Sequence, residues 1–251
     1  MTYVQTEQHG AVRHVILNRP ERLNAISGAL MDDLHEALRA AQSAPDVKVI
    51  VFSGNGRAFC AGDDLKEFGD QTRSPQAIVE HIERIQQITR DLMFGDKPVV
   101  GAIHGFAVGG GFEWLLNCDL VVAADNLVAF FPELDWGQFV TGGVTHLLPQ
   151  GVGYQKAMEL WLLGERQGAA DLKALGLVNW VVPAEQTVAR ALEVAQVVAG
   201  KSTFSVSRLK RLVTTQLSQQ LAASLEMEKA VAVESFARPE AAERVKKFGK
   251  Q

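Results

Sequence analysis

Cysteine, long apolar runs and targeting signals are all scarce or missing in this chain. Cys60 and Cys118 are the only cysteines among 251 residues, and they lie in different motifs, so the sequence has neither a disulfide framework nor a cysteine metal-ligand spacing. No apolar run approaches the ~18 residues of a membrane span. Residues 1–7 resemble neither a signal peptide nor an Arg-rich presequence. We therefore expect a reducing, cytoplasmic compartment and no membrane association.

A strong excess of charge of one sign is also missing. The net charge is −4, so the sequence shows no nucleic-acid footprint. The chain is 47% hydrophobic and 22% charged, a composition that suits one large domain or a domain with a small appendage.

Apolar runs and helical periodicities alternate along most of the chain, which predicts an α/β fold. We predict strands at residues 12–17, 47–52, 99–103, 120–124, 128–131 and 178–182. We predict helices at residues 26–38, 75–93, from 112, from 142, 154–162 and 169–175. After Pro183 the pattern is helical almost to the end, so we divide the chain into a core, residues 1–183, and a helical C-terminal region, residues 184–251. The strand-turn-helix theme recurs loosely, which allows a solenoid-like arrangement.

The stretch between residues 98 and 119 is the centre of the pattern. A buried strand leads through a turn at Gly105 to three glycines, 109–111, and then to an apolar helix that carries Glu113 in its first turn. Glycines at a helix start leave N–H groups accessible, where the helix dipole favours negative charge. A carboxylate there would repel a phosphate but suits an oxyanion hole with an adjacent acid or base. A nucleotide-binding glycine turn and close strand-helix packing are the alternatives; neither the Rossmann nor the P-loop spacing is present.

Glu133 is the second candidate, because it follows a strand and two phenylalanines. A desolvated carboxyl there would have a raised pKa suited to proton transfer, whereas a solvated turn residue is the simpler alternative. The turn at residues 61–64 is the third candidate and could present another backbone N–H; an ordinary Asp-rich turn is the alternative. Sequence spacing alone does not bring these three segments together.

Other chemistries have less support in the sequence. The histidines, among them His9 and His14, are scattered, and the Gly-x-Ser-x-Gly elbow of serine hydrolases is absent. The basic residues of the C-terminal region, including Arg208, Lys210 and Arg211, are interpreted as a solvated helix face. The aromatic segment around Trp136 and Phe139 is interpreted as core packing, with a pocket for a bulky acyl group as the alternative.

Several ordered motifs together resemble the enoyl-CoA hydratase/isomerase (crotonase) superfamily, over residues 3–250. They are Leu-Asn-Arg-Pro at 17–20, Leu-Asn-Ala at 23–25, Ala-Phe-Cys-Ala-Gly-Asp-Asp-Leu at 58–65, Ala-Ile-His-Gly-Phe-Ala-Val-Gly-Gly-Gly-Phe-Glu at 102–113, Cys-Asp at 118–119 and Phe-Pro-Glu at 131–133. The resemblance implies a spiral of β-β-α turns with a helical C-terminal region that assembles trimers or pairs of trimers. It also implies an acyl-CoA thioester substrate and no metal or redox cofactor, since coenzyme A is part of the substrate.

The resemblance further implies the roles of individual residues. The backbone N–H groups of Asp63 and Gly110 would hold the thioester oxygen. Glu113 would activate water for attack at Cβ, and Glu133 would deliver a proton to Cα. The remaining positions of these motifs would line the substrate site, namely Leu23, Ala25, Ala61, Gly62, Asp64, Leu65 and Gly109.

The expected activity is therefore the hydration of a trans-2-enoyl-CoA. The alternatives are a Δ3,Δ2-enoyl-CoA isomerase, a hydrolase of acyl-CoA or diketone bonds, and a non-catalytic CoA-binding scaffold. The carboxylate of Asp63 conflicts with this role, because its negative charge would repel the negative charge that develops on the thioester oxygen. We expect that side chain to turn away, towards solvent, a backbone cap or a cation.

Overall fold

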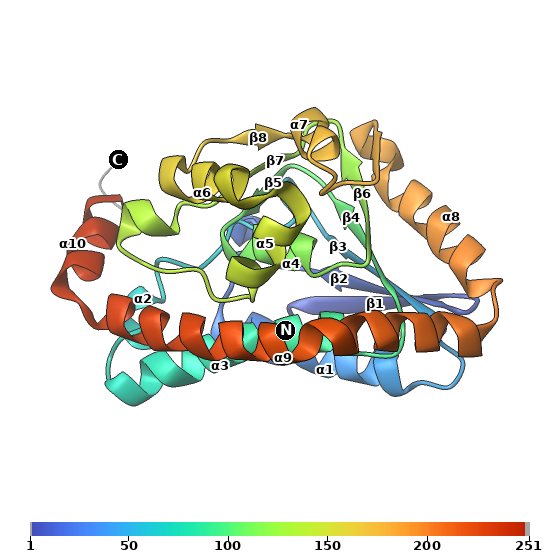
Figure 1. Cartoon of the computed structure of the whole chain (residues 1–251), viewed down its shortest axis with the longest axis horizontal. Coiled ribbons are helices and arrows are strands. Elements are labelled where there is room, and N and C mark those ends of the chain that lie inside the picture. The colour runs from blue at the N-terminus through green and yellow to red at the C-terminus, as the bar shows by residue number, and fades with distance from the viewer. Residues whose placement is uncertain (1, 249–251) are drawn as a thin grey trace.

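The computed structural model describes residues 2–248, and two sheets form its framework (Figure 1). The larger sheet has the order β1-β2-β3-β4-β6-β9, in which β1 and β2 are antiparallel and the other neighbours are parallel. Its strands are β1 (Val4–His9), β2 (Val12–Leu17), β3 (Val49–Gly54), β4 (Val99–Ile103), β6 (Leu120–Ala124) and β9 (Trp180–Val182). The smaller sheet has the order β5-β7-β8, with β5 (Phe106–Val108), β7 (Val128–Phe130) and β8 (Gln167–Gly168).

Helices cover both faces of the larger sheet. They are α1 (Gly28–Ser43), α2 (Phe68–Gln71), α3 (Pro75–Met93), α4 (Gly110–Leu116), α5 (Val144–Val152), α6 (Tyr154–Leu163), α7 (Ala169–Ala174), α8 (Thr187–Ala199), α9 (Thr203–Ala237) and α10 (Pro239–Phe248). Short 3-10 turns lie at Pro20–Arg22, Glu133–Trp136 and Ala184–Gln186. Within residues 2–248, no helix is both long and apolar enough to cross a membrane.

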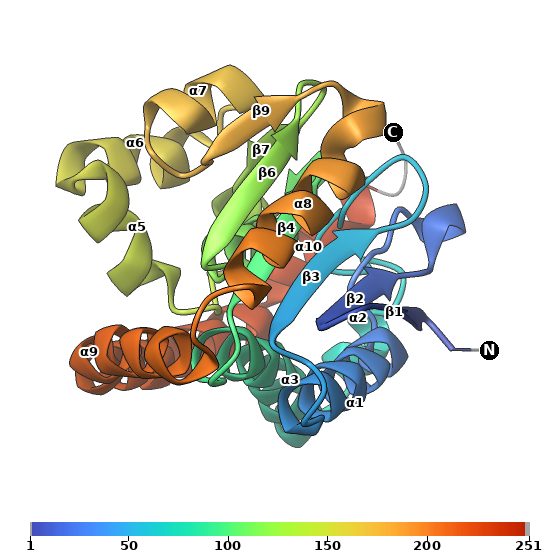
Figure 2. The ribbon, with the colours of Figure 1, turned by 90° about the vertical axis from the view of Figure 1, so that its right-hand side faces the viewer.

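The side chains of the larger sheet divide between two cores. On one face, Val12, Val49, Val51, Val100 and Val122 pack against α8, which Figure 2 shows lying across the strands. On the other face, alternate residues of the same strands pack against α1, α3 and α4. Parallel strands buried on both faces explain the continuous apolar runs from which most of them were predicted.

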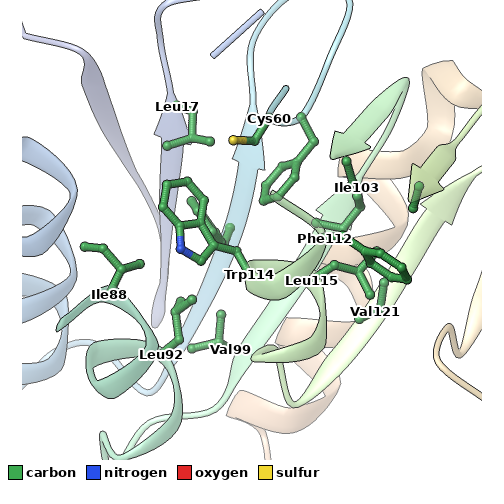
Figure 3. Close-up of a cluster of buried hydrophobic side chains, with 14 of the residues drawn as sticks. Leu17, Cys60, Ile88, Leu92, Val99, Ile103, Phe112, Trp114, Leu115 and Val121 are labelled. Carbon is green, nitrogen blue, oxygen red and sulfur yellow. The ribbon is translucent and has the colours of Figure 1, made fainter. Parts of the chain in front are cut away.

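Helix α4 lies in the middle of the larger core (Figure 3). Trp114 and Phe112 are fully buried there, and Trp114 packs with Phe52 at a centroid distance of 6.1 Å. Because every side of α4 meets other elements, the position of its N-terminus is fixed by packing rather than by local propensity. The candidate site described below begins at that N-terminus.

The sequence-based elements agree with the structure for β2, β4, β6 and α3, and the α/β fold with a helical C-terminal region is confirmed. Three short or exposed strands were missed. β1 is an edge strand in which only Val4 is buried, β5 has three residues and β8 has two, so none carries a clear apolar run.

The helices after residue 184 pack onto the core. Helix α8 covers one face of the larger sheet, and α9 lies along α3 (Figure 1). The interpretation of the basic residues as a solvated face is wrong for Lys210, which is only 6% exposed. Its Nζ donates to Asp119 Oδ2 at 2.6 Å and to the carbonyl oxygens of Leu92 and Lys97 at 2.9 and 3.1 Å. Lys210 thus fastens the start of α9 to the segments at the end of α3 and before β4.

We expect Lys210→Met to lower the free energy of unfolding by about 3 kcal/mol, because it breaks a buried ion pair and leaves two carbonyl groups without their donor. Met keeps most of the apolar stem, so the loss reports on the ammonium group. Arg211→Met, at an exposed position of the same helix, is the control and should change stability by less than about 0.5 kcal/mol. Denaturant unfolding of the two variants measures the difference; equal stabilities would contradict this role of Lys210.

Candidate active site

The site begins at the N-terminus of α4. Gly109, between β5 and α4, has a φ of +52°, and a side chain at this position would overlap Oε1 of Glu133. The position therefore requires glycine on both conformational and steric grounds. Gly110 starts the helix, so its N–H has no intrahelical acceptor.

The turn at residues 61–64 supplies a second backbone donor. A β-bridge pairs Asp63 with Ile26: the N–H of Ile26 donates to Gly62 O and the N–H of Asp64 donates to Ile26 O. This pattern directs the N–H of Asp63 away from Ile26. Within residues 2–248, the backbone N–H groups of Asp63 and Gly110 have no hydrogen-bond acceptor, and both residues line one small cavity of about 20 Å³. Two unpaired donors at one cavity can stabilise an oxygen that gains negative charge.

Glu113 lies in the first turn of α4 and is almost completely buried. Its carboxylate accepts hydrogen bonds from the backbone N–H of Thr141 at 2.9 Å and from the Thr141 hydroxyl at 3.2 Å. Thr141 lines the small cavity, so Glu113 stands immediately beside it. A side chain at Gly142 would collide with Glu113, which explains one of the paired glycines in the sequence.

Glu133 reaches the same cavity from another element. It follows β7 and begins the 3-10 turn Glu133–Trp136, and it is 8% exposed. Its Oε2 is buried without a hydrogen-bond partner among the described residues. The interpretation as a solvated turn residue is therefore wrong, and Glu133 is the desolvated carboxyl that its aromatic neighbours suggested.

Burial and nearby negative charges raise the pKa of both carboxyl groups. Burial, together with the nearby charges of Glu133 and Glu228, raises the pKa of Glu113 well above its usual range. Burial raises the pKa of Glu133 to about 8, and the charge of Asp63 adds to that effect. Because the pKa of Glu133 is higher in the folded than in the unfolded chain, its contribution to stability is present at low pH and is lost as the pH rises through about 8.

The side chain of Asp63 turns towards a buried histidine. Its Oδ2 lies 3.3 Å from Nε2 of His81, a histidine of α3 that is only 5% exposed. His81 was not recognised from the sequence as part of this site, since it belongs to the apolar face of a helix with no motif around it. The carboxylate of Asp63 thus lies against the imidazole of His81, while the backbone N–H of Asp63 has no hydrogen-bond acceptor within residues 2–248.

Glu228 is a further buried carboxylate that the sequence analysis missed. It lies on α9, is 1% exposed, and accepts hydrogen bonds from the backbone N–H groups of Gly143 and Thr145 at 2.7 and 2.8 Å. The Thr145 hydroxyl also donates to it at 2.6 Å. The sequence did contain one indication of its burial: Glu228 lies between Leu225 and Ala232 on the apolar face of α9, where a charged residue is unexpected. Glu228 fixes the loop that carries Thr141.

Three cavities adjoin one another, and Glu133 lines two of them. Five of the predicted substrate-binding residues line a groove of about 450 Å³, namely Leu23, Ala25, Ala61, Asp64 and Leu65. The other residues that line it are Arg22, Asp63, Lys66, Trp136 and Val245. The groove shares Asp63 and Trp136 with the small cavity, which Gly62, Gly109 and Gly110 also line. The small cavity shares Glu133 and Phe139 with an apolar cavity of about 280 Å³. The structure therefore brings the predicted site residues from four separate segments to one continuous region.

The aromatic segment has two roles in this region. Phe131 belongs to the core and stacks on Phe112 at 4.6 Å, as core packing predicts. Phe131 and Phe139 also line the 280 Å³ cavity, together with Met158, Trp161 and other apolar residues of α6 and the loop before α5. The segment is thus part of the core and one wall of a pocket.

Comparison with known proteins identifies relatives over most of the chain. An enoyl-CoA hydratase/isomerase family model matches residues 7–250. The mitochondrial enoyl-CoA hydratase of Pongo abelii is 33% identical over 241 residues, which cover 94% of this chain and 81% of that protein. The probable mitochondrial enoyl-CoA hydratase of Dictyostelium discoideum is 34% identical over 224 residues, covering 89% of this chain and 79% of that protein.

A solved structure agrees with these sequence matches. The enoyl-CoA hydratase/isomerase from Mycobacterium paratuberculosis superimposes with a TM-score of 0.93 at 27% identity, and 98% of each chain is covered. The agreement extends over both sheets and the C-terminal helices, because so little of either chain is left out.

We expect Asp63→Asn to lower the pKa of Glu133 below its value of about 8, because the substitution removes the negative charge that Glu133 now faces. Titration of the ¹³C-labelled carboxyl groups by NMR measures this pKa in the free protein. Asp135→Asn is the matched control: Asp135 is close in sequence but exposed, and its removal should leave the pKa unchanged. An unchanged Glu133 pKa in Asp63→Asn would show that burial alone sets the value.

Proposed function

The chain belongs to the enoyl-CoA hydratase/isomerase family, and we propose that it is an enoyl-CoA hydratase, which adds water reversibly to a trans-2-enoyl-CoA thioester. One observation carries the assignment within the family. Glu113 and Glu133 are buried carboxyls with raised pKa values, and both lie beside one small cavity. Asp63 and Gly110 line the same cavity, and their backbone N–H groups have no hydrogen-bond acceptor within residues 2–248.

The N–H groups of Asp63 and Gly110 would hold the thioester oxygen. Attack of water at Cβ moves electrons towards that oxygen, which becomes enolate-like. Backbone donors already in place cost no reorganisation when this charge develops, and each contributes roughly 3–4 kcal/mol in a water-excluded site. The N-terminal end of α4 adds a favourable dipole at Gly110.

The two glutamates would divide the proton transfers. Glu113 takes a proton from water as the water oxygen bonds to Cβ, and Glu133 gives a proton to Cα as the enolate collapses. One water is added and the pair of carboxyls exchanges one proton, so the pair must hold one proton before the reaction. Burial and the repulsion between the two negative charges disfavour the state in which both carboxyls are ionised, so the pair retains a proton that Glu133 can give.

The three cavities suggest how the substrate lies. Arg22 and Lys66 line the groove and are suited to the phosphates of coenzyme A. The apolar cavity beyond Glu133 suits the acyl chain, and the thioester would lie between them, at the cavity that both adjoin. On this proposal coenzyme A enters as part of the substrate, and the proton transfers need no metal or redox cofactor.

The other reactions of this fold fit the arrangement less well. An isomerase needs only one carboxyl to move a proton between carbons, whereas here two carboxyls of raised pKa flank one cavity. A thioester or diketone hydrolase could use the same N–H groups. Incubation with crotonyl-CoA separates these activities: loss of enoyl absorbance reports hydration, free thiol reports hydrolysis, and binding without turnover reports a scaffold.

We further propose a trimer or a hexamer as the working assembly, in the cytoplasm. Helix α9 supports the assembly: its residues Leu221 and Leu225 are buried in the chain, but Leu209, Leu212 and Val213 are 66, 63 and 50% exposed. Clustered exposed apolar residues on one helix end are typical of a surface that another protein covers. The cytoplasmic location rests on the sequence alone.

Glu113→Gln and Glu133→Gln should each lower kcat for crotonyl-CoA hydration at least ~100-fold with little change in KM, because each removes a proton transfer and not ground-state binding. Glu193→Gln, whose side chain is exposed on α8, is the control and should retain full activity. Near-normal hydration by Glu113→Gln would refute the two-carboxylate mechanism. If that variant lost hydration but kept isomerase activity, the isomerase assignment would replace the hydratase.

Light scattering coupled to size exclusion should give three or six times the chain mass of 27.3 kDa. Leu209→Glu with Leu212→Glu should dissociate the assembly, because two charges would replace exposed apolar side chains at the proposed interface. The same pair of changes at Leu162 and Leu163, which are also exposed, tests whether any apolar patch has this effect. A monomeric wild type would refute the proposal.

A further inference from the structure

A group of three potential metal ligands lies on the β1–β2 hairpin, outside the acyl-CoA site. The antiparallel register pairs Glu7 directly with His14. His9 is two residues from Glu7 on the same strand, so its side chain leaves the same face of the sheet. The pairing unites histidines that are scattered in the sequence.

The potential ligand atoms are close to one another. Oε2 of Glu7 lies 3.2 Å from Nε2 of His9 and 3.7 Å from Nδ1 of His14. One ligand atom from each of the three residues falls within a common limit of 4.8 Å. In a tetrahedral zinc site, metal–ligand bonds near 2.1 Å place the ligand atoms about 3.4 Å apart. The two distances to Glu7 already match that spacing.

His14 is the most constrained member of the group. It is only 4% exposed, and its Nε2 is within 2.7 Å of the hydroxyl of Ser53 on β3. Its Nδ1 is buried, has no hydrogen-bond partner among residues 2–248, and faces Glu7. A buried polar atom without a partner costs free energy, so it demands an explanation. Metal-binding histidines commonly use one ring nitrogen for the metal and fix the other by a hydrogen bond, as Ser53 does here.

We propose that Glu7, His9 and His14 form a binding site for a divalent transition-metal ion, with Zn²⁺ as the representative. Two imidazole nitrogens and one carboxylate oxygen form a donor set that zinc accepts, and the fourth position would hold water. The side chain of His9 is 38% exposed, so it can rotate to close the remaining distance to His14. The bound ion would join β1, the edge strand, to the buried histidine of β2.

The competing explanation is an ordinary polar cluster, in which Glu7 pairs with His9 and no ion binds. The two explanations differ in measurable ways, because only the metal site gives saturable binding at a ratio of one ion per chain. The proposal is independent of the hydratase assignment, and its tests do not use enzyme activity.

The first test is calorimetric titration of the tag-free full-length protein with Zn²⁺. Wild type should bind one ion per chain, and His9→Ala or Glu7→Ala should each weaken binding at least tenfold. Both side chains are exposed, so both variants should fold. His146→Ala is the matched control, because it removes a histidine on α5 that contacts Gln150 and not this group. Zn²⁺ should also raise the melting temperature of wild type and His146→Ala more than that of His9→Ala.

The second test identifies the ligands. Cu²⁺ binds nitrogen and oxygen sites more tightly than Zn²⁺, and its electron paramagnetic resonance spectrum reports the number of bound imidazole nitrogens. Wild type should show two nitrogens and His9→Ala one. The proposal is overturned if wild type shows no saturable Zn²⁺ binding below millimolar concentration. It is also overturned if His9→Ala and Glu7→Ala bind as tightly as wild type, or if the copper spectrum is the same in His9→Ala.

Discussion

The burial of the Glu113 carboxylate is the constraint on which the rest of the site depends. A carboxylate inside a core costs free energy unless it is hydrogen-bonded or protonated. Here Thr141 supplies both of its hydrogen bonds, from the backbone and from the hydroxyl, and the remaining cost appears as a raised pKa. The same burial makes the group useful, because a carboxyl with a raised pKa is a better base than a solvated one. Stability and function therefore compete at this residue.

The support for Glu113 extends to the far end of the chain. Thr141 belongs to a loop whose next residues, Gly143 and Thr145, donate to Glu228 on α9. Helix α9 is in turn fastened to the core near its start by the hydrogen bonds of Lys210. The C-terminal region thus stabilises the loop that holds Glu113, although the two carboxyls proposed for the proton transfers lie in other segments.

The sequence predicted the local parts of this arrangement and missed the parts that only tertiary contacts create. Glu113 and Glu133 stand out because each follows a strand or a glycine turn, and a strand end is recognisable from its apolar run. Glu228 and Lys210 occupy helical positions without any motif, and their partners lie 85 and 91 residues away. Likewise, β1 has too little apolar character to be recognised, so the pairing of Glu7 with His14 was out of reach. The sequence therefore did not reveal contacts between segments that carry neither a motif nor a clear apolar run.

Asp63 is an example of such a contact, because the sequence places a negative side chain beside a proposed oxyanion donor and only the structure shows where that side chain lies. Its backbone N–H is unpaired at a cavity suited to a negatively charged oxygen, while its side chain carries the same sign of charge. Two unit charges about 5 Å apart repel by about 3 kcal/mol at an effective dielectric near 20, which would cancel one donor. The carboxylate lies against Nε2 of His81 on the buried face of α3, which gives it a polar partner. Its charge raises the pKa of Glu133, which favours the protonated form that a proton donor to Cα would need.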